Sequence, residues 1–310
     1  MNPVTWITGA NGFIGSHLVR ACTENKKVIK FFRPEFFSSN TNKDVLSYPL
    51  EKTGINDAIA NHGYPSRVYH LAGAPTVGQS FSCPHQDFNS NVITTEVLLN
   101  ALSGSKAHII FSSSAAVYGD GHSNGIRIND KLSPKSPYGH HKIISEKLIK
   151  LYTEHFDLSA TILRLFSVYG NGLRKQLLYD CCSKLNIYSI NTPLVLGGTG
   201  DELRDWLEVS DVVAAMKNLE NLQSGDFQIY NLATGRPTRI EYIANKIISL
   251  WGKSHQLEFN KIKRPGDPFS LTANPSSLPP AFVPKITIDQ GIEKYINWFK
   301  SLDENMDQVL

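Results

Sequence analysis

The fold is decided near the N-terminus by the stretch Thr8-Gly9-Ala10-Asn11-Gly12-Phe13-Ile14-Gly15, where three glycines recur at a G-x-x-G-x-x-G spacing. It follows the strand-like run Val4–Thr8 and precedes a helix expected from Gly15 to about Asn25. In such a unit Gly9 permits the tight turn, Gly12 lets the backbone approach a pyrophosphate, and Gly15 allows close helix–strand packing. Phosphates would meet N–H groups at the positive end of that helix. The alternative is a glycine-rich turn without a ligand, but the strand–turn–helix context favours a dinucleotide site.

Outward from this turn, β-branched runs alternate with helical stretches, which is typical of a parallel sheet covered on both faces. We expect a doubly wound parallel α/β (Rossmann) domain over residues 1–169, to which about 209–235 return. A smaller, interleaved α/β substrate domain would comprise 170–208 and 236–310, with a loop at 197–200 and a closing helix near 289–302. Within the first domain, strands are expected at 27–32, 67–72, 108–112 and 160–165, and helices at 91–102 and from 136–137 onward.

Composition excludes several classes of protein. The 310 residues are 41% hydrophobic and 19% charged, with a formal charge of +3, and no basic run suggests nucleic acid. No uncharged apolar stretch approaches the ~18 residues of a membrane span, and because Val4–Thr8 follows the first residues directly we expect no targeting segment. The four cysteines (Cys22, Cys83, Cys181 and Cys182) lack metal-ligand spacing. We expect a cytoplasmic protein with reduced cysteines and no metal.

The end of the second strand bears on the choice of cofactor. NAD sites usually carry an acidic side chain there for the ribose 2′-hydroxyl, whereas NADP sites use a cation for the 2′-phosphate. The strand ends Phe31-Phe32-Arg33, with no carboxylate until Glu35. Arg33 could bind a phosphate through paired hydrogen bonds, or be a solvated arginine. NADP is therefore the favoured cofactor and NAD the alternative.

Tyr138 and Lys142 are four residues apart at the start of an expected helix, so they share one face. A lysine ammonium beside a phenol favours the phenolate and is expected to lower its pKa from about 10. The tyrosine could then exchange a proton with an alcohol or ketone oxygen near neutral pH. The run Ser112–Ser114 follows a strand expected to end at the same sheet edge as the glycine turn, so a serine hydroxyl could bind the reacting oxygen.

Together these motifs resemble the extended short-chain dehydrogenase/reductases of the nucleotide-sugar epimerase/dehydratase type, with an NAD(P) cofactor. The motifs that carry the resemblance, in the family's order, are TGANGFIG at 8–15, HLAG at 70–73, NVITTEVLLNA at 91–101, FSSSAAVYGD at 111–120, SPYGHHK at 136–142, RDWLEVSDV at 204–212 and RPGD at 264–267.

The resemblance implies that Tyr138 is the general acid/base, that Lys142 binds the nicotinamide ribose and tunes Tyr138, and that Ser114 is the catalytic serine. The cofactor contacts that it implies, besides Tyr138, Lys142 and Arg33, are Gly9, Asn11, Gly12, Phe13, Ile14, Gly15, Asp44, Leu71, Ala72, Gly73, Ser90, Asn91, Ser112 and Phe166.

The nucleotide-sugar substrate is expected in the second domain, where the resemblance makes Arg204 and Arg264 the cations for its pyrophosphate. Ser167 matches a further substrate contact, beside Ser114. Family likeness also implies a homodimer through the helices near 91–102 and 137–154, and a role in polysaccharide biosynthesis. The pair His140-His141 belongs to no metal set and is expected on the helix surface.

Two alanines narrow the reaction. Dehydratases resembling this chain carry acidic residues just after the catalytic serine, and the reductases that also epimerise carry a cysteine two residues after it; here Ala115 and Ala116 stand there. Hydride transfer at one sugar carbon, C4, remains. The favoured reading is an NADPH-dependent 4-ketoreductase of nucleotide hexoses, because Arg33 stands where a recycled NAD would need a carboxylate. The alternative is an NAD-dependent 4-epimerase. A non-catalytic cofactor-binding sensor is disfavoured, since Tyr138, Lys142 and Ser114 are all present.

Overall fold

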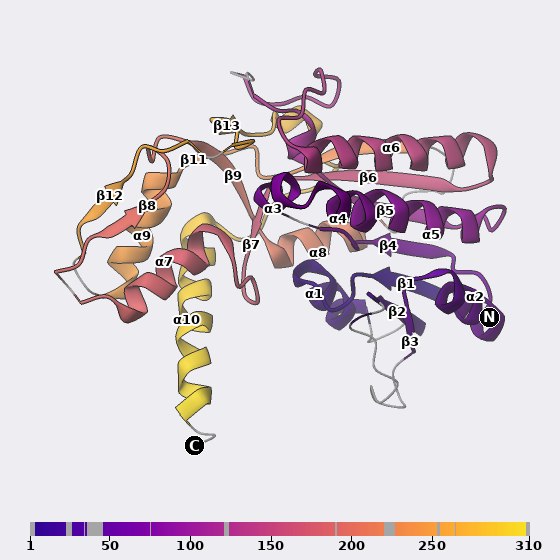
Figure 1. Ribbon diagram of the computed structural model, residues 1–310, viewed down its shortest axis with the longest axis horizontal. Helices are drawn as coiled ribbons and strands as arrows, with labels where there is room; N and C mark the ends of the chain where they lie inside the picture. The colour runs from indigo at the N-terminus through magenta and orange to yellow at the C-terminus, as the bar shows by residue number, and fades with distance from the viewer. Residues whose placement is uncertain are drawn as a thin grey trace. The chain divides into compact units, whose positions relative to one another are not determined.

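The computed structural model forms two compact units, each described here by itself (Figure 1). The first comprises Met1–Gly119, Ile128–Leu165 and Val213–Asn231, and the second Asp120–Arg127, Phe166–Val212 and Leu232–Leu310. The residues that the structure describes within them are 4–22, 27–33, 35, 46–74, 76–120, 124–189, 191–219, 227–252, 255–263 and 265–307.

The first unit is built on a seven-stranded sheet in which every pair whose register is described runs parallel. Its strand order reverses between β4 and β1, which is where open α/β sheets bind ligands at the carboxyl ends of their strands. The strands, in spatial order, are β10 (Phe227–Leu232), β6 (Ser159–Leu165), β5 (His108–Ser114), β4 (Arg67–His70), β1 (Val4–Thr8), β2 (Lys27–Phe32) and β3 (Ser47–Pro49).

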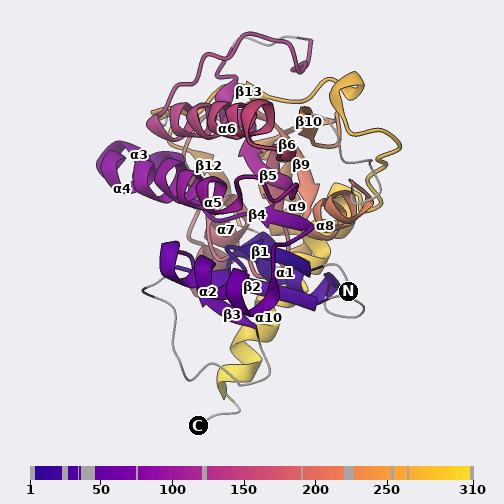
Figure 2. The ribbon, with the colours of Figure 1, turned by 90° about the vertical axis from the view of Figure 1, so that its right-hand side faces the viewer.

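Helices cover both faces of this sheet, which is why the central strands β1 and β5 are buried along nearly their whole length (Figure 2). Helices α2 (Lys52–His62), α5 (Thr94–Leu102) and α6 (Pro137–His155) enclose a core with Trp6 and Val68. On the other face, helix α1 (Phe13–Cys22) lies beside α8 (Val209–Asn218), where Lys217 Nζ donates to the carbonyl of Ala21 at 2.7 Å. The doubly wound α/β fold expected from the sequence is confirmed.

Two helical segments carry site residues, and one begins as predicted. Ser136 caps α6 by accepting a hydrogen bond from the N–H of Gly139 at 3.2 Å, and Pro137 takes the first helical position. Of the helix predicted over 91–102, α5 forms the part from Thr94 onward, and 91–93 belong to a π-helical turn, Asn89–Ile93. Helices α3 (Val77–Ser82) and α4 (Pro84–Phe88) come before this turn. Such turns often accompany functional sites. Strand β3 and helix α2 were not expected from the sequence.

Among its described residues, the second unit contains two small sheets and three α-helices that lie wholly within it. The first sheet consists of β11 (Pro237–Arg239), β9 (Leu203–Glu208) and β13 (Ser270–Leu271), with β7 (Ser167–Tyr169) also paired to β9; the second consists of β12 (Leu257–Phe259) and β8 (Leu194–Leu196). The helices are α7 (Gln176–Ile187), α9 (Ile240–Trp251) and α10 (Ile288–Asp307), the last of which is the closing helix that the sequence predicts. Throughout the described part of the chain, no helix combines the length and apolarity needed to cross a bilayer.

Candidate active site

The glycine turn leaves no room for larger residues. Gly9 has φ +64°, and a β-carbon there would lie 2.9 Å from the amide nitrogen of Ala72. A β-carbon on Gly15 would lie 2.1 Å from the carbonyl oxygen of Gly9, so the start of α1 presses directly on the turn. Helix α1 begins at Phe13 and carries no acidic residue in its first turn, which leaves its positive end open to an anion.

The strand beside this turn is held in register by a buried hydrogen-bonded chain. The hydroxyl oxygen of Thr8 accepts from the backbone N–H groups of Leu71 and Ala72, both at 3.1 Å. Its own proton therefore goes to Nδ1 of His70, 2.8 Å away, and Nε2 of His70 donates to the hydroxyl of Thr95 at 2.9 Å. Burial, aided by the charge of Lys142, lowers the pKa of His70 to about 3, so the imidazole is neutral.

These features fit a dinucleotide. Gly73 follows β4, and a β-carbon on it would lie 2.6 Å from Oδ1 of Asn91 and 3.3 Å from Nζ of Lys142. That Oδ1 is buried and has no hydrogen-bond partner among the described residues, so it can accept from a ligand hydroxyl. At this edge of the sheet, the closely packed glycines therefore lie beside a hydrogen-bond acceptor, Oδ1 of Asn91, and a cation, Lys142.

Arg33 ends the stretch after β2 and is half-exposed, with its NH1 3.8 Å from Oε1 of Glu35. It lines a polar pocket together with Ala74, Gln79, Cys83, Gln86, Asp87 and Ser90. Arg33 and Ser90, both predicted cofactor contacts, therefore face one pocket. Asp44, predicted to contact the adenine, lies outside the described residues.

Three predicted catalytic side chains meet at the ends of β5 and α6. Ser114 is the last residue of β5, and its hydroxyl is hydrogen-bonded to that of Tyr138. Lys142 Nζ lies 5.8 Å from the centre of the Tyr138 ring and 4.8 Å from that of Phe111, and donates to the carbonyl oxygen of Ser112 at 3.0 Å. Tyr138 is 8% and Lys142 4% exposed, so both work in a site that excludes water.

Burial governs the titration of this pair. It raises the pKa of Tyr138 to about 12, against the opposing hydrogen bond from Ser114 and with the support of the Asp87 charge. It also lowers the pKa of Lys142 to about 8. The expectation that the lysine would leave the phenol with a lowered pKa is therefore wrong for the protein's own groups, because desolvation is the largest influence on the pKa of each.

A second ion pair supports the serine run from behind. Glu146 of α6 receives the Nε of Arg164 at 3.0 Å and its NH2 at 2.7 Å, and also the hydroxyl of Ser113 at 2.5 Å. Arg164 NH1 donates to the hydroxyl of Tyr118 at 2.7 Å. Both Glu146 and Arg164 are buried, so this bidentate pair joins β5, β6 and α6 and sets the place of Ser114.

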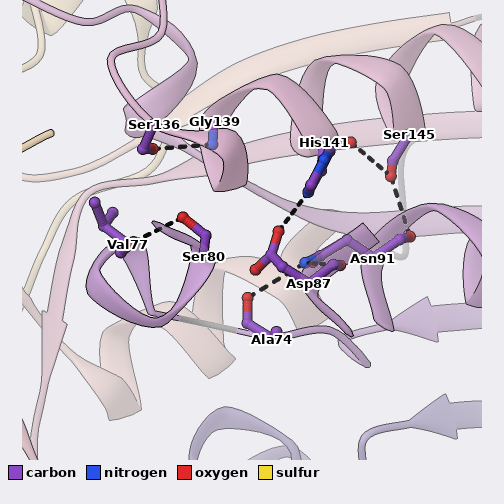
Figure 3. A network of polar contacts seen from close by, with 9 residues as sticks. All are labelled: Ala74, Val77, Ser80, Asp87, Asn91, Ser136, Gly139, His141 and Ser145. Carbon is purple, nitrogen blue, oxygen red and sulfur yellow. Dashed lines mark hydrogen bonds and ion pairs between the residues drawn. The ribbon is translucent and has the colours of Figure 1, made fainter. Parts of the chain in front are cut away.

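One pair near the site was missed by sequence reasoning. Oδ2 of Asp87, on α4, lies 2.5 Å from Nδ1 of His141, on α6 (Figure 3). The expectation that the histidine pair lies on the helix surface holds for exposed His140 and fails for His141, whose side chain is 13% exposed. Only tertiary packing brings these two positions together, so no local sequence pattern predicts the pair.

Apart from Ser114, the predicted substrate contacts belong to the second unit. Arg204 is buried on β9, where its NH2 lies 2.5 Å from Oδ1 of Asp267 and its NH1 donates to the carbonyl of Leu203 at 2.8 Å. Its charge is thus already paired, and binding a pyrophosphate would require this ion pair to open. Phe166 is buried and Ser167 partly buried at the start of β7. Arg264 lies outside the described residues.

The remaining reactive side chains form no further centre. No cluster of three or more histidine, cysteine, aspartate or glutamate side chains among the described residues could hold a metal ion. No disulfide joins any of the four cysteines, all of which lie in the described part of the chain; Cys83 is exposed, and the others are buried. Burial raises the pKa of Cys182 to about 12 and that of Cys181 further, which keeps both as thiols.

Comparison with known proteins identifies a family that matches most of the chain. A model of the NAD-dependent epimerase/dehydratase family matches residues 5–233. An uncharacterised UDP-glucose epimerase of Bacillus subtilis is 27% identical over 315 residues, covering 96% of this chain and 98% of its own.

Solved structures show the same similarity over nearly the whole chain. The protein MoeE5, solved with UDP-glucuronic acid and NAD, has a TM-score of 0.84 at 26% identity, covering 96% of this chain and 99% of that one. UDP-glucose 4-epimerase of Thermotoga maritima, solved with UDP-glucose, has a TM-score of 0.84 at 25% identity and the same coverage.

Proposed function

The chain belongs to the NAD-dependent epimerase/dehydratase family and is an enzyme of the short-chain dehydrogenase/reductase type, and we propose that it inverts C4 of a UDP-hexose with NAD as its cofactor. The observation that carries this proposal is the meeting of Ser114, Tyr138 and Lys142 beside the glycine turn, within one compact unit. Relatives named as UDP-glucose 4-epimerases support the choice of substrate and reaction.

The NADPH-dependent ketoreductase that the sequence favours is less well supported than the epimerase. Both reactions use the same serine, tyrosine and lysine, so the site does not separate them. The distinction was drawn from Arg33 alone, while the similar proteins are epimerases or are solved with NAD. These similarities support the alternative, the 4-epimerase, better than the ketoreductase.

In the proposed reaction, Tyr138 moves one proton at O4 of the sugar. As phenolate it takes the hydroxyl proton while C4 loses a hydride, which leaves a 4-keto sugar. After the keto sugar turns over, C4 regains the hydride on its other face and Tyr138 returns the proton to O4. Atoms and electrons balance over the cycle, so no net oxidant or reductant is consumed.

Bound NAD would supply the hydride acceptor and donor, and its oxidised, positively charged ring would favour the phenolate. Ser114 hydrogen-bonds the hydroxyl of Tyr138 and can also orient O4. Lys142, anchored on the Ser112 carbonyl, is placed to hold the cofactor's ribose and to favour the phenolate electrostatically. Gly9, Gly12 and Gly15 would hold the pyrophosphate.

A substrate panel tests this function. The enzyme is incubated with UDP-glucose, UDP-glucuronic acid and UDP-N-acetylglucosamine in the presence of catalytic NAD, and separately with nucleotide 4-keto-hexoses and NADPH. We expect inversion of at least one UDP-sugar without net change in cofactor absorbance. Stoichiometric loss of NADPH on a keto sugar, with no inversion in the first set, would support the reductase instead.

The choice of NAD is tested by binding at Arg33. If NAD is the cofactor, the half-exposed guanidinium makes no essential contact, and Arg33→Ala should change the Kd for NAD by less than about threefold. Isothermal titration calorimetry on wild type and variant measures this with NAD and NADP. Tighter binding of NADP by wild type, lost in Arg33→Ala, would show that Arg33 holds a 2′-phosphate.

We also propose a homodimer formed through α6 and the segment before α5. Ile93 is 44% exposed, and Ile144 and Leu151 on α6 are 38% and 44% exposed, seven residues apart on one helix face. Ile144→Glu should shift the sedimentation coefficient of a dimer to that of a monomer, because a charge would be buried in the interface. Tyr64→Glu, at a position 52% exposed outside these helices, is the control that should remain dimeric.

A further inference from the structure

The pair formed by Asp87 and His141 lies beside the catalytic helix face without a part in the reaction described above. His141 stands between Tyr138 and Lys142 in the sequence of α6, and it faces α4 rather than solvent (Figure 3). Its Nδ1 is 2.5 Å from Oδ2 of Asp87, and its ring meets Phe88 edge-on at 5.3 Å. Asp87 is 3% exposed, so its carboxylate is almost wholly withdrawn from water.

Only one oxygen of this carboxylate is satisfied. Oδ1 of Asp87 is buried and has no hydrogen-bond partner among the described residues. A buried carboxylate with a bare oxygen is costly, and a simple tie between two helices would be made more cheaply by neutral side chains. Asp87 lines the same polar pocket as Arg33, and because its side chain is 3% exposed its charge is screened less than a charge in bulk water.

Asn91 connects the backbone of Asp87 with the surroundings of Lys142. Asn91 Nδ2 donates to the backbone carbonyl of Asp87 at 2.9 Å, and to that of Ala74 at 3.5 Å. Oδ1 of the same Asn91 and Nζ of Lys142 both lie against Gly73, near the position that a β-carbon would take. The backbone of Asp87 and the ammonium of Lys142 are therefore linked through one asparagine, and the charge of Asp87 acts on Lys142.

The other groups around Lys142 leave Asp87 as its effective counter-charge. On β4, His70 is neutral, and on β5 the lysine meets the Phe111 ring and the Ser112 carbonyl. Tyr138, on the same helix, is a phenol. Glu146 also faces the lysine from α6, but both its oxygens are bound by the guanidinium of Arg164 from β6. Asp87 and Glu146 both act against the burial that lowers the pKa of Lys142.

We propose that Asp87 is a positioning residue for Lys142: its carboxylate, held in place by His141, keeps the buried lysine charged so that it can act on Tyr138. The idea rests on the proposed function only for the kinetic part of its test. His141 has the subordinate task of fixing the orientation of the carboxylate through Nδ1. The catalytic machinery thus extends one layer outward, from α6 to α4.

The test compares Asp87→Asn with His141→Asn in the pH dependence of kcat/KM. Activity requires charged Lys142 and so falls as pH rises through the pKa of the lysine, about 8. Removing the Asp87 charge lowers that pKa, so the alkaline limb of Asp87→Asn should move to lower pH by about one unit. In His141→Asn the carboxylate remains and the amide can donate to it, so the limb should stay or move to higher pH. Asp87→Glu, which restores the charge, should restore the limb.

A second readout needs no catalysis. The pH titration of Lys142, followed by NMR of enzyme labelled with ¹³C at lysine Cε, should shift downward in Asp87→Asn and not in His141→Asn. Lys142→Arg assigns the signal. If both asparagine variants lose stability alike while the Lys142 titration stays put, Asp87 is only a structural tie and the proposal is overturned. If Asp87→Asn does not fold, Asp87→Glu and Asp87→Ser replace it. A Lys142 titration that is unchanged in Asp87→Glu and shifted downward in Asp87→Ser supports the proposal, and a titration that is unshifted in both variants overturns it. Failure to epimerise any UDP-sugar would leave this NMR result standing, so the two proposals fail separately.

Discussion

Tyr138→Phe is expected to lower kcat by about a thousandfold, which is within the range for removing a general acid/base. The phenylalanine ring fills the same buried volume, so the fold and the packing against Lys142 should persist. What is lost is the hydroxyl that Ser114 binds and that exchanges a proton with O4. The Kd values for NAD and for the UDP-sugar should change by less than about threefold, because the other predicted contacts and the buried ring remain in place.

Tyr152→Phe is the matched control for this variant. Tyr152 lies on the same helix, packed against Phe156 at a ring distance of 4.7 Å, and loses only a hydroxyl. Its turnover should equal that of wild type. Coupled assays of epimer formation, with calorimetric binding of NAD, measure both variants. Retention of more than about a tenth of wild-type kcat in Tyr138→Phe would remove Tyr138 from its assigned role.

Gly15→Ala is expected to damage both stability and cofactor binding. The added methyl group would lie 2.1 Å from the carbonyl oxygen of Gly9, so α1 must move away from the turn. A backbone clash in a closely packed site costs about 2–4 kcal/mol in the free energy of unfolding. Because the phosphates depend on the same turn, the Kd for NAD should rise by more than about tenfold.

Gly78→Ala is the control for this glycine. Gly78 lies in α3, and a β-carbon on it would meet nothing within 4 Å, so alanine should be neutral or slightly stabilising there. Urea denaturation and NAD titration of the two variants separate steric strain from a general effect of removing a glycine. Wild-type stability and affinity in Gly15→Ala would contradict the geometry of the turn.

The sequence predicts best those features whose structure depends on a few neighbouring residues. Examples are the turn Thr8–Gly15, the serine and proline at the start of α6, and the strand-like runs of β1 and β5. The family assignment follows from the order of such motifs.

The features that sequence reasoning missed depend on contacts between distant segments. Asp87 and His141 are separated by α5, β5 and a long connection, and nothing near either residue announces the other. The Tyr138 pKa was judged from its neighbour four residues away, whereas burial by the whole fold decides it. Likewise, Arg204 reads as a free cation in the sequence, and only the fold shows Asp267 beside it.

The choice between reductase and epimerase could not be predicted from the sequence for a different reason. Arg33 is a real departure from the acidic residue expected at an NAD site, and it does line a polar pocket. One side chain at the adenosine end of a cofactor nevertheless reports on affinity rather than on the reaction, which takes place at the nicotinamide end. Turnover therefore has to be tested at C4 of the sugar.

The most direct measurement follows the hydrogen at that carbon. UDP-glucose deuterated at C4 is incubated with the enzyme and catalytic NAD in ordinary water, and the products are examined by NMR and mass spectrometry. Hydride transfer to a retained cofactor predicts the C4 epimer with its deuterium kept at C4 and none exchanged with solvent. An epimer that has lost deuterium to water, or no epimer from this or any other UDP-hexose, would contradict the account.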